Sequence, residues 1–169
     1  SSVRERCLTG TNEAAVAQRL HLDPRSVTGY NLGEHGNSQF TAWSTVRVLD
    51  QPITELAKDR GLDLDSLDHE AELAALPFSG QEVHQLRVAT AAVRLVNTIL
   101  SDAHTELPVS NYREEYGTYL SYPAVVGRDG ILEQVQLDLT DEELEKLQTS
   151  ANYIKQKYAE SQEAAKEGK

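Results

Sequence analysis

The chain has 169 residues, which is enough for one domain of ordinary size with its own buried core. Its 27 acidic residues against 16 basic ones give a net charge of −11, so the surface repels phosphate backbones and nucleic acid is not expected as a partner. With 39% hydrophobic and 25% charged residues, the composition is that of a chain that folds.

Cysteine and methionine usage bears on the compartment and origin of the chain. Cys7 is the only cysteine, so no intrachain disulfide can form, and we expect a cytoplasmic protein. The longest uncharged apolar run, near residues 88–93, is far shorter than the ~20 residues of a membrane span, and no signal peptide is expected. The chain has no methionine, which fits a processed fragment, a chain released from a tag, or a sequence written to avoid methionine.

The first third of the chain predicts a short helix followed by a loop. Thr11 or Asn12 can cap a helix over residues 13–19, where alanine provides the helix propensity. A β-prone stretch at 26–30 leads into residues 31–37, which contain two glycines and two asparagines. We expect this segment to be a loop at the end of a strand.

The middle of the chain predicts helices separated by polar connectors. Residues 40–47 fit helix or strand equally well, and connectors follow near 50–52 and 58–65. A helix begins at Ser66 and is interrupted by the turn signal at 77–80. Beyond this break, apolar residues recur at steps of three and four, which predicts the strongest helix, with its stripe facing the core. These residues are Val88, Ala92, Leu95, Val96, Ile99 and Ala103.

The last third predicts a hairpin and a terminal helix. Residues 119–126 and 131–139 are two strands joined by a tight Asp-Gly turn, and Pro123 favours an edge or a bulge in the first strand. Thr140 and Glu143 form a capping box. One face of the helix that follows carries Leu144, Leu147, Ala151, Ile154 and Tyr158.

Together these elements predict an α+β domain in which antiparallel strands pack against a long middle helix and a terminal helix. We expect the domain to occupy residues 1–158. Residues 159–169 are polar enough to fray and form a tail.

One segment carries a specific motif. Residues 23–38 read Asp-Pro-Arg-Ser-Val-Thr-Gly-Tyr-Asn-Leu-Gly-Glu-His-Gly-Asn-Ser. This order closely resembles the signature around the catalytic histidine of the lactate and malate dehydrogenase superfamily. Residues 89–92, 119–130 and 137–140 also look like this family. The resemblance covers roughly residues 24–158 and is strongest to L-2-hydroxyisocaproate dehydrogenases.

The resemblance implies the fold of the lactate/malate dehydrogenase C-terminal domain, the half that binds the 2-hydroxyacid or 2-ketoacid substrate. His35 would then be the proton-transfer group, because an imidazole with a pKa of about 6.5 can accept the hydroxyl proton in oxidation and return it in reduction. NAD would accept the hydride. The alternative is a loop histidine without chemistry.

Two residues of the family's site are altered near the start of the chain. The family pairs its histidine with an orienting aspartate and, three residues later, has an arginine that binds the substrate carboxylate in a bidentate manner. Ungapped comparison through Gln18 and Arg19 places Glu13 at the aspartate position and Val16 at the arginine position. A valine cannot bind a carboxylate.

Further departures concern substrate contacts and control. By resemblance, His84 falls near a threonine that faces substrate, and Val88 near the aliphatic residue that packs on the nicotinamide. His84 could provide a hydrogen bond, but a surface helix residue is the alternative that we favour. Thr28 stands where lactate dehydrogenases activated by fructose bisphosphate have a histidine, so this control is not expected.

The chain has no motif for binding the dinucleotide itself. Gly33 and Gly36 do not form a Gly-x-Gly-x-x-Gly turn after a strand, so the NAD-binding fold is absent from this sequence. No metal site is expected either, because the residue four after His69 is Leu73 and not a second histidine.

We therefore expect the substrate-side domain of an NAD-dependent L-2-hydroxyacid dehydrogenase that is inactive alone, with neither nucleic acid nor membrane as a partner. A homodimer through the middle helices is expected by resemblance. The alternatives are an engineered, non-catalytic scaffold derived from this domain, and a chain that regains weak activity with a separately supplied nucleotide-binding half.

Overall fold

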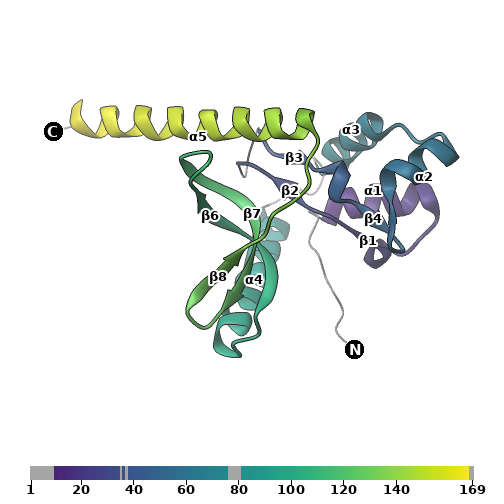
Figure 1. Cartoon of the computed structure of the whole chain (residues 1–169), viewed down its shortest axis with the longest axis horizontal. Helices are drawn as coiled ribbons and strands as arrows, with labels where there is room; N and C mark the ends of the chain where they lie inside the picture. The colour runs from purple at the N-terminus through teal and green to yellow at the C-terminus, as the bar shows by residue number, and fades with distance from the viewer. Residues whose placement is uncertain (1–9, 35, 37, 76–80, 168–169) are drawn as a thin grey trace.

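The computed structural model describes residues 10–34, 36, 38–75 and 81–167, with the side chains of 10–13, 70–75, 81–87 and 167 outside the description. In chain order the elements are α1 (Gly10–Leu20), η1 (Pro24–Ser26), β1 (Val27–Thr28), β2 (Asn31–Leu32), β3 (Phe40–Thr41), η2 (Trp43–Thr45), β4 (Arg47–Val48), β5 (Gln51–Pro52), α2 (Ile53–Arg60), α3 (Leu64–Ala75), α4 (Gln81–Leu100), β6 (Thr105–Arg113), β7 (Thr118–Gly127), β8 (Gly130–Gln134) and α5 (Asp141–Glu167) (Figure 1). Helices and strands are mixed as expected.

The strands of the described residues form three antiparallel sheets. The first has the order β1-β4-β5, the second pairs β2 with β3, and the third has the order β6-β7-β8. An isolated bridge between Gly33 and Ser121 joins the end of β2 to β7. The architecture is α+β, and β7 connects the β6-β7-β8 sheet to the segment that holds β2.

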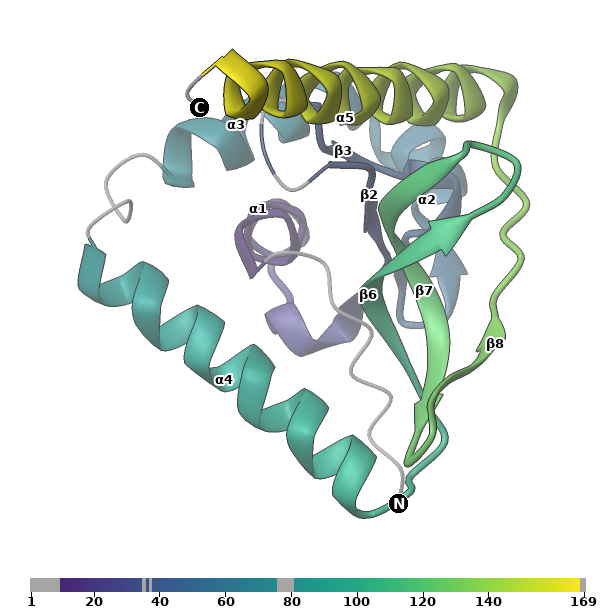
Figure 2. The same cartoon turned by 90° about the vertical axis from the view of Figure 1, so that its left-hand side faces the viewer.

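The described residues form two hydrophobic cores. The first lies between α1, α2, α3 and the β1-β4 strands, and its buried members are Val16, Ala17, Leu20, Val27, Val46, Val48, Ile53 and Leu67. The second lies between β2, β7 and α5, and its buried members are Tyr30, Leu32, Ala42, Leu120, Tyr122, Leu147 and Ala151. Figures 1 and 2 both show α5 lying across one end of the β6-β7 hairpin.

The capping box predicted at the start of α5 is present. The backbone N–H of Glu143 donates to the Thr140 hydroxyl at 3.2 Å, and the N–H of Thr140 donates to the Glu143 carboxylate at 3.0 Å. The same carboxylate accepts hydrogen bonds from the N–H and the hydroxyl of Ser44 at 2.9 and 2.5 Å. The helix start is thereby fixed to η2, 99 residues away in the sequence.

The face predicted for the terminal helix is only partly buried. Leu147 and Ala151 are fully buried, whereas Leu144 and Tyr158 are 43% and 66% exposed. The core covers only the first part of α5, because its buried side chains lie between Glu143 and Ala151. Instead of fraying at residue 159, the helix continues to Glu167, and the side chains of residues 159–166 are exposed.

The predicted hairpin corresponds to β7 and β8, but its details differ from the expectation. Pro123 does not mark an edge or a bulge, because β7 is the central strand and the irregularity lies at Val125/Val126. The pairing with β8 ends at Ala124, so no β8 ladder hydrogen bond needs an N–H from Pro123. Strand β6, which pairs along the whole of β7, was not predicted.

Helix α4 is present as predicted, but its apolar stripe does not face a core. Val88 and Val96 are 53% and 50% exposed, Ala92 and Ala103 are also exposed, and Leu95 and Ile99 are partly covered. Figure 2 shows α4 standing apart from the other helices.

Just beyond the end of α4, a hydrogen bond from the Arg128 N–H lowers the pKa of the Asp102 carboxyl. In the described part of the chain, no helix is long and apolar enough to cross a bilayer.

Truncating the buried face of α5 should destabilise the fold far more than truncating its exposed face. Leu147→Ala leaves a cavity against β7 and should lower the free energy of unfolding by about 3 kcal/mol. Leu144→Ala, on the preceding turn, should cost under about 1 kcal/mol. Urea denaturation followed by circular dichroism measures both. Equal losses would show that α5 does not pack as described.

Candidate functional site

The backbone at Gly33, within the motif of residues 23–38, is fixed by strand β7. The N–H of Gly33 donates to the Ser121 carbonyl at 3.3 Å, and the N–H of Ser121 donates to the Gly33 carbonyl at 2.9 Å. Gly33 has φ +97°, and a Cβ at this position would lie 2.6 Å from Oγ of Ser150. Glycine is therefore required twice, by its backbone conformation and by the close approach of α5.

The next residue is held by a closed ring of hydrogen bonds. The N–H of Glu34 donates to Oγ of Ser150 at 2.7 Å, and both the N–H and the hydroxyl of Ser38 donate to Oε2 of Glu34, at 3.1 and 2.7 Å. Oγ atoms of Ser38 and Ser150 are 2.9 Å apart. Since the single Ser38 hydroxyl proton goes to the carboxylate, the proton between the two serines belongs to Ser150. Every member of the ring then has its partner.

This ring holds the residue that precedes the candidate histidine in the chain. His35 itself lies outside the described residues, but it is bonded to Glu34, whose N–H and carboxylate are both fixed. The hydroxyl of Ser150 is inaccessible to solvent, because the residue is 0% exposed. Position 35 thus follows a rigid segment anchored to both β7 and α5.

Both candidates at the start of the chain lie on α1, and Val16 belongs to the first core. Glu13 lies on α1, with its side chain outside the described part. Val16, the residue at the arginine position, is 0% exposed and packs in the first core. Its side chain lies among apolar neighbours, where a substrate carboxylate would be desolvated without a partner. Val16 therefore serves the fold.

The candidates on the middle helix are one helical turn apart. His84 and Val88 both lie on α4, and their spacing of four residues places them on one helix face. The side chain of His84 is outside the described part, whereas that of Val88 is 53% exposed. Helix α4 packs on β7, the strand that also anchors Gly33. Of the candidates on described backbone, His84 and Val88 thus lie together on α4, whereas Glu13 lies on α1.

The residues that position the turn were not identified from the sequence. Ser121 acts through its backbone, and nothing in its side chain reveals this role. Ser150 offered a signal, because it falls three residues after Leu147, on the buried face of α5. A hydroxyl on a buried helix face needs a hydrogen-bond partner, and such a residue is therefore a candidate for a positioning group.

The described residues do not fit a dinucleotide. All three sheets are antiparallel, whereas the NAD-binding fold requires parallel strands, crossover helices and a glycine-rich turn at a helix start. Metal binding has no support in this part of the chain either, since it holds no group of three or more His, Cys, Asp or Glu side chains placed around one point.

Comparison with known proteins gives one consistent result. The family model for the lactate/malate dehydrogenase alpha/beta C-terminal domain matches residues 3–165. An L-lactate dehydrogenase of Selenomonas ruminantium is 36% identical over 157 residues, which cover 83% of this chain and 47% of the relative. The chain spans about half the length of the curated relatives that it matches.

Solved structures agree in fold. A lactate dehydrogenase, MGS-M5, from a Medee basin deep-sea metagenome library superimposes with a TM-score of 0.77 and 28% identity, covering 88% of this chain and 50% of that one. The minor L-lactate dehydrogenase of Enterococcus mundtii, in its ligands-bound form, gives 0.75 and 30%, with coverages of 87% and 50%.

Removing the Ser150 hydroxyl should loosen the turn specifically. Ser150→Ala leaves the Glu34 N–H without its acceptor, so the free energy of unfolding should fall by about 2 kcal/mol. Amide exchange at Glu34 should accelerate as well. Thr149→Ala, on the exposed side of the same turn, is the control and should change stability by less than about 0.5 kcal/mol. Unaltered exchange at Glu34 in Ser150→Ala would mean that the ring does not hold the turn.

Proposed function

The chain belongs to the lactate/malate dehydrogenase C-terminal-domain family, and from that premise we propose that it is the substrate-side half of an NAD-dependent L-2-hydroxyacid dehydrogenase. The proposal assigns this role to residues 1–158 and regards 159–169 as an appended tail. The observation that carries it is the glycine turn before His35, which two separate elements hold rigidly.

In this proposal His35 moves a proton and does not touch the hydride. The imidazole takes the proton from the substrate hydroxyl during oxidation and returns it to the ketone oxygen during reduction. Efficient transfer needs the ring at hydrogen-bond distance from that oxygen, so the backbone that presents it must be rigid. The ring formed by Glu34, Ser38 and Ser150 supports this requirement. Glu13 would orient the imidazole, and His84 and Val88 would line the substrate side.

The hydride acceptor would come from a nucleotide-binding half. NAD supplies the hydride chemistry when bound, and the antiparallel sheets described here offer it no site. The 169-residue chain by itself is therefore proposed to be inactive. A second candidate function, a non-catalytic scaffold, is favoured by the complete burial of Val16 in the first core. The resemblance would place the carboxylate-binding arginine of the family at this position.

The isolated chain should not oxidise NADH in the presence of a 2-ketoacid. The reason is that the sheets of the described residues offer NADH no binding site, so the rate should equal that of His35→Ala. Absorbance at the NADH wavelength measures it. Turnover by the chain alone that disappears in His35→Ala would contradict the proposal.

Adding a nucleotide-binding half separates the two candidate functions. The substrate-domain proposal expects weak activity in the mixture, lost in His35→Ala and retained in His69→Ala, a histidine on the exposed surface of α3. The scaffold alternative expects no activity in the mixture and no heat of binding for oxamate in calorimetry. Activity retained in His35→Ala would contradict both.

Three exposed apolar side chains on one face of α4 support a homodimer within this proposal. Val93, Val96 and Leu100 are 59%, 50% and 71% exposed at a spacing of three and four residues, the spacing that packs one helix against another. A second copy of the chain would cover this face and remove its apolar side chains from water.

A charge placed among Val93, Val96 and Leu100 should dissociate the dimer. Sedimentation equilibrium at ~100 µM should show a dimer for the parent chain and a monomer for Val96→Glu, because a buried glutamate lacks a partner. Asn97→Glu adds the same charge one position along and should remain dimeric. A parent chain that stays monomeric at this concentration would contradict the proposed homodimer.

A further inference from the structure

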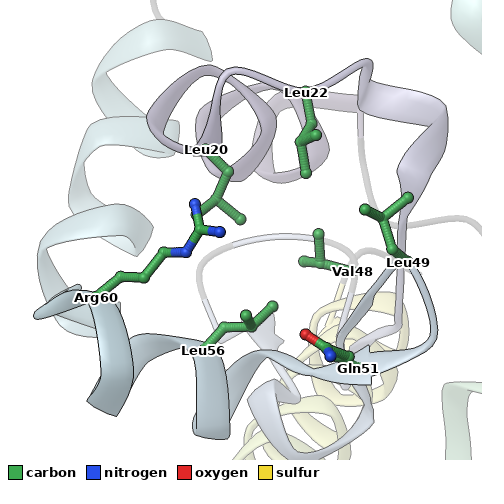
Figure 3. Close-up of a pocket in the computed structure, with 7 residues that line it drawn as sticks. All are labelled: Leu20, Leu22, Val48, Leu49, Gln51, Leu56 and Arg60. Carbon is green, nitrogen blue, oxygen red and sulfur yellow. The ribbon is translucent and has the colours of Figure 1, made fainter.

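A small apolar cavity opens in the first core, on other elements than those that hold the His35 turn. Its volume is about 170 Å³. It lies between the end of α1, the β4-β5 hairpin and α2, as Figure 3 shows. The residues that line it are Leu20, Leu22, Val48, Leu49, Gln51, Leu56 and Arg60.

The floor of the cavity suits a short alkyl group. Leu20 and Val48 are almost completely buried, and Leu22 and Leu56 are partly buried and pack on the same core. An apolar cavity of about 150 Å³ is large enough to take up benzene, so this space accommodates a chain of about six carbon atoms. No lysine, aspartate or glutamate lines it.

The mouth of the cavity carries an exposed leucine in a strained conformation. Leu49 and Asp50 form the two-residue turn between β4 and β5, with φ values of 50° and 66°. This turn type favours Asn-Gly, and a leucine in the left-handed region costs about 1 kcal/mol or more. Leu49 is nevertheless 64% exposed and lines the cavity. Residues in strained backbone conformations cluster at active and ligand-binding sites.

A guanidinium supplies a cation at the same mouth. Arg60 lies in the last turn of α2, and Figure 3 shows its head group reaching over the cavity beside Leu20. Within the described part of the chain, no carboxylate lies at ion-pair distance from it. The amide of Gln51 stands across from it on the hairpin. A cation at the opening of a leucine-lined space complements an anion with an alkyl tail.

We propose that this cavity binds a short aliphatic monocarboxylate, with its alkyl end among Leu20, Val48 and Leu56 and its carboxylate on Arg60. Size limits the ligand to about six carbon atoms. Its negative charge is what Arg60 recognises, while Gln51 can donate a second hydrogen bond. This proposal does not rest on the function proposed above, because the lining residues of the cavity include none of the residues that hold the turn at Gly33 and Glu34.

Titration with 4-methylpentanoate, followed by amide chemical shifts in nitrogen-15 spectra, tests the site directly. We expect saturable shifts confined to the lining residues and their neighbours, with a Kd on the order of 1 mM for so small a ligand. The corresponding alcohol, 4-methylpentan-1-ol, should bind about tenfold more weakly because it lacks the charge, and acetate should not saturate because it lacks the tail.

Two substitutions on α2 provide the matched comparison. Arg60→Gln should weaken binding of 4-methylpentanoate about tenfold, whereas Lys58→Gln removes a charge from the same helix, outside the cavity, and should leave Kd unchanged. Spectra of both variants without ligand show whether the fold is intact. Arg60→Lys keeps the charge without the planar donor pair and should bind with intermediate affinity. The proposal is overturned if no saturation occurs below about 50 mM, or if Arg60→Gln binds like the parent chain.

Discussion

The hydroxyl of Ser150 is the contact on which the candidate site depends. It accepts the Glu34 N–H and donates to Ser38, whose own hydroxyl donates to the Glu34 carboxylate. Because Ser150 is completely buried, no water can replace it if the contact is lost. The terminal helix therefore does more than cover the core. It fixes the segment that leads to His35 from a position 116 residues later in the chain.

Strand β7 gives the molecule its second constraint. It pairs with β6 and β8 at its edges, bonds to Gly33 through Ser121, and packs against both α4 and α5. A rigid strand with these contacts can relate the His35 turn to the helix that carries Val88, although the two are distant in sequence. Under the proposed function, this domain would contribute groups that move a proton and shape the substrate site, and NAD, bound to a separate fold, would take the hydride.

Local signals in the sequence were predictive, and signals that depend on distant packing were not. The box of Thr140 and Glu143 was found because both partners lie within one turn. Helix α4 was also found, but its periodicity reports an apolar face and cannot say what covers it, so the expected burial was wrong. Strand β6 was missed since it holds a proline and polar residues, and only pairing with β7 makes it a strand. Ser150 acts across 116 residues, beyond any local pattern.

The most direct measurement of the central claim is the pH dependence of 2-ketoacid reduction by this chain combined with a nucleotide-binding half. Reduction consumes a proton that a protonated imidazole must donate, so kcat/KM should fall as the pH rises and the imidazole loses its proton. His35→Gln should have no measurable rate at any pH. A kcat/KM that stays constant from pH 5 to 8, or a profile that survives His35→Gln, would contradict the assignment of proton transfer to His35.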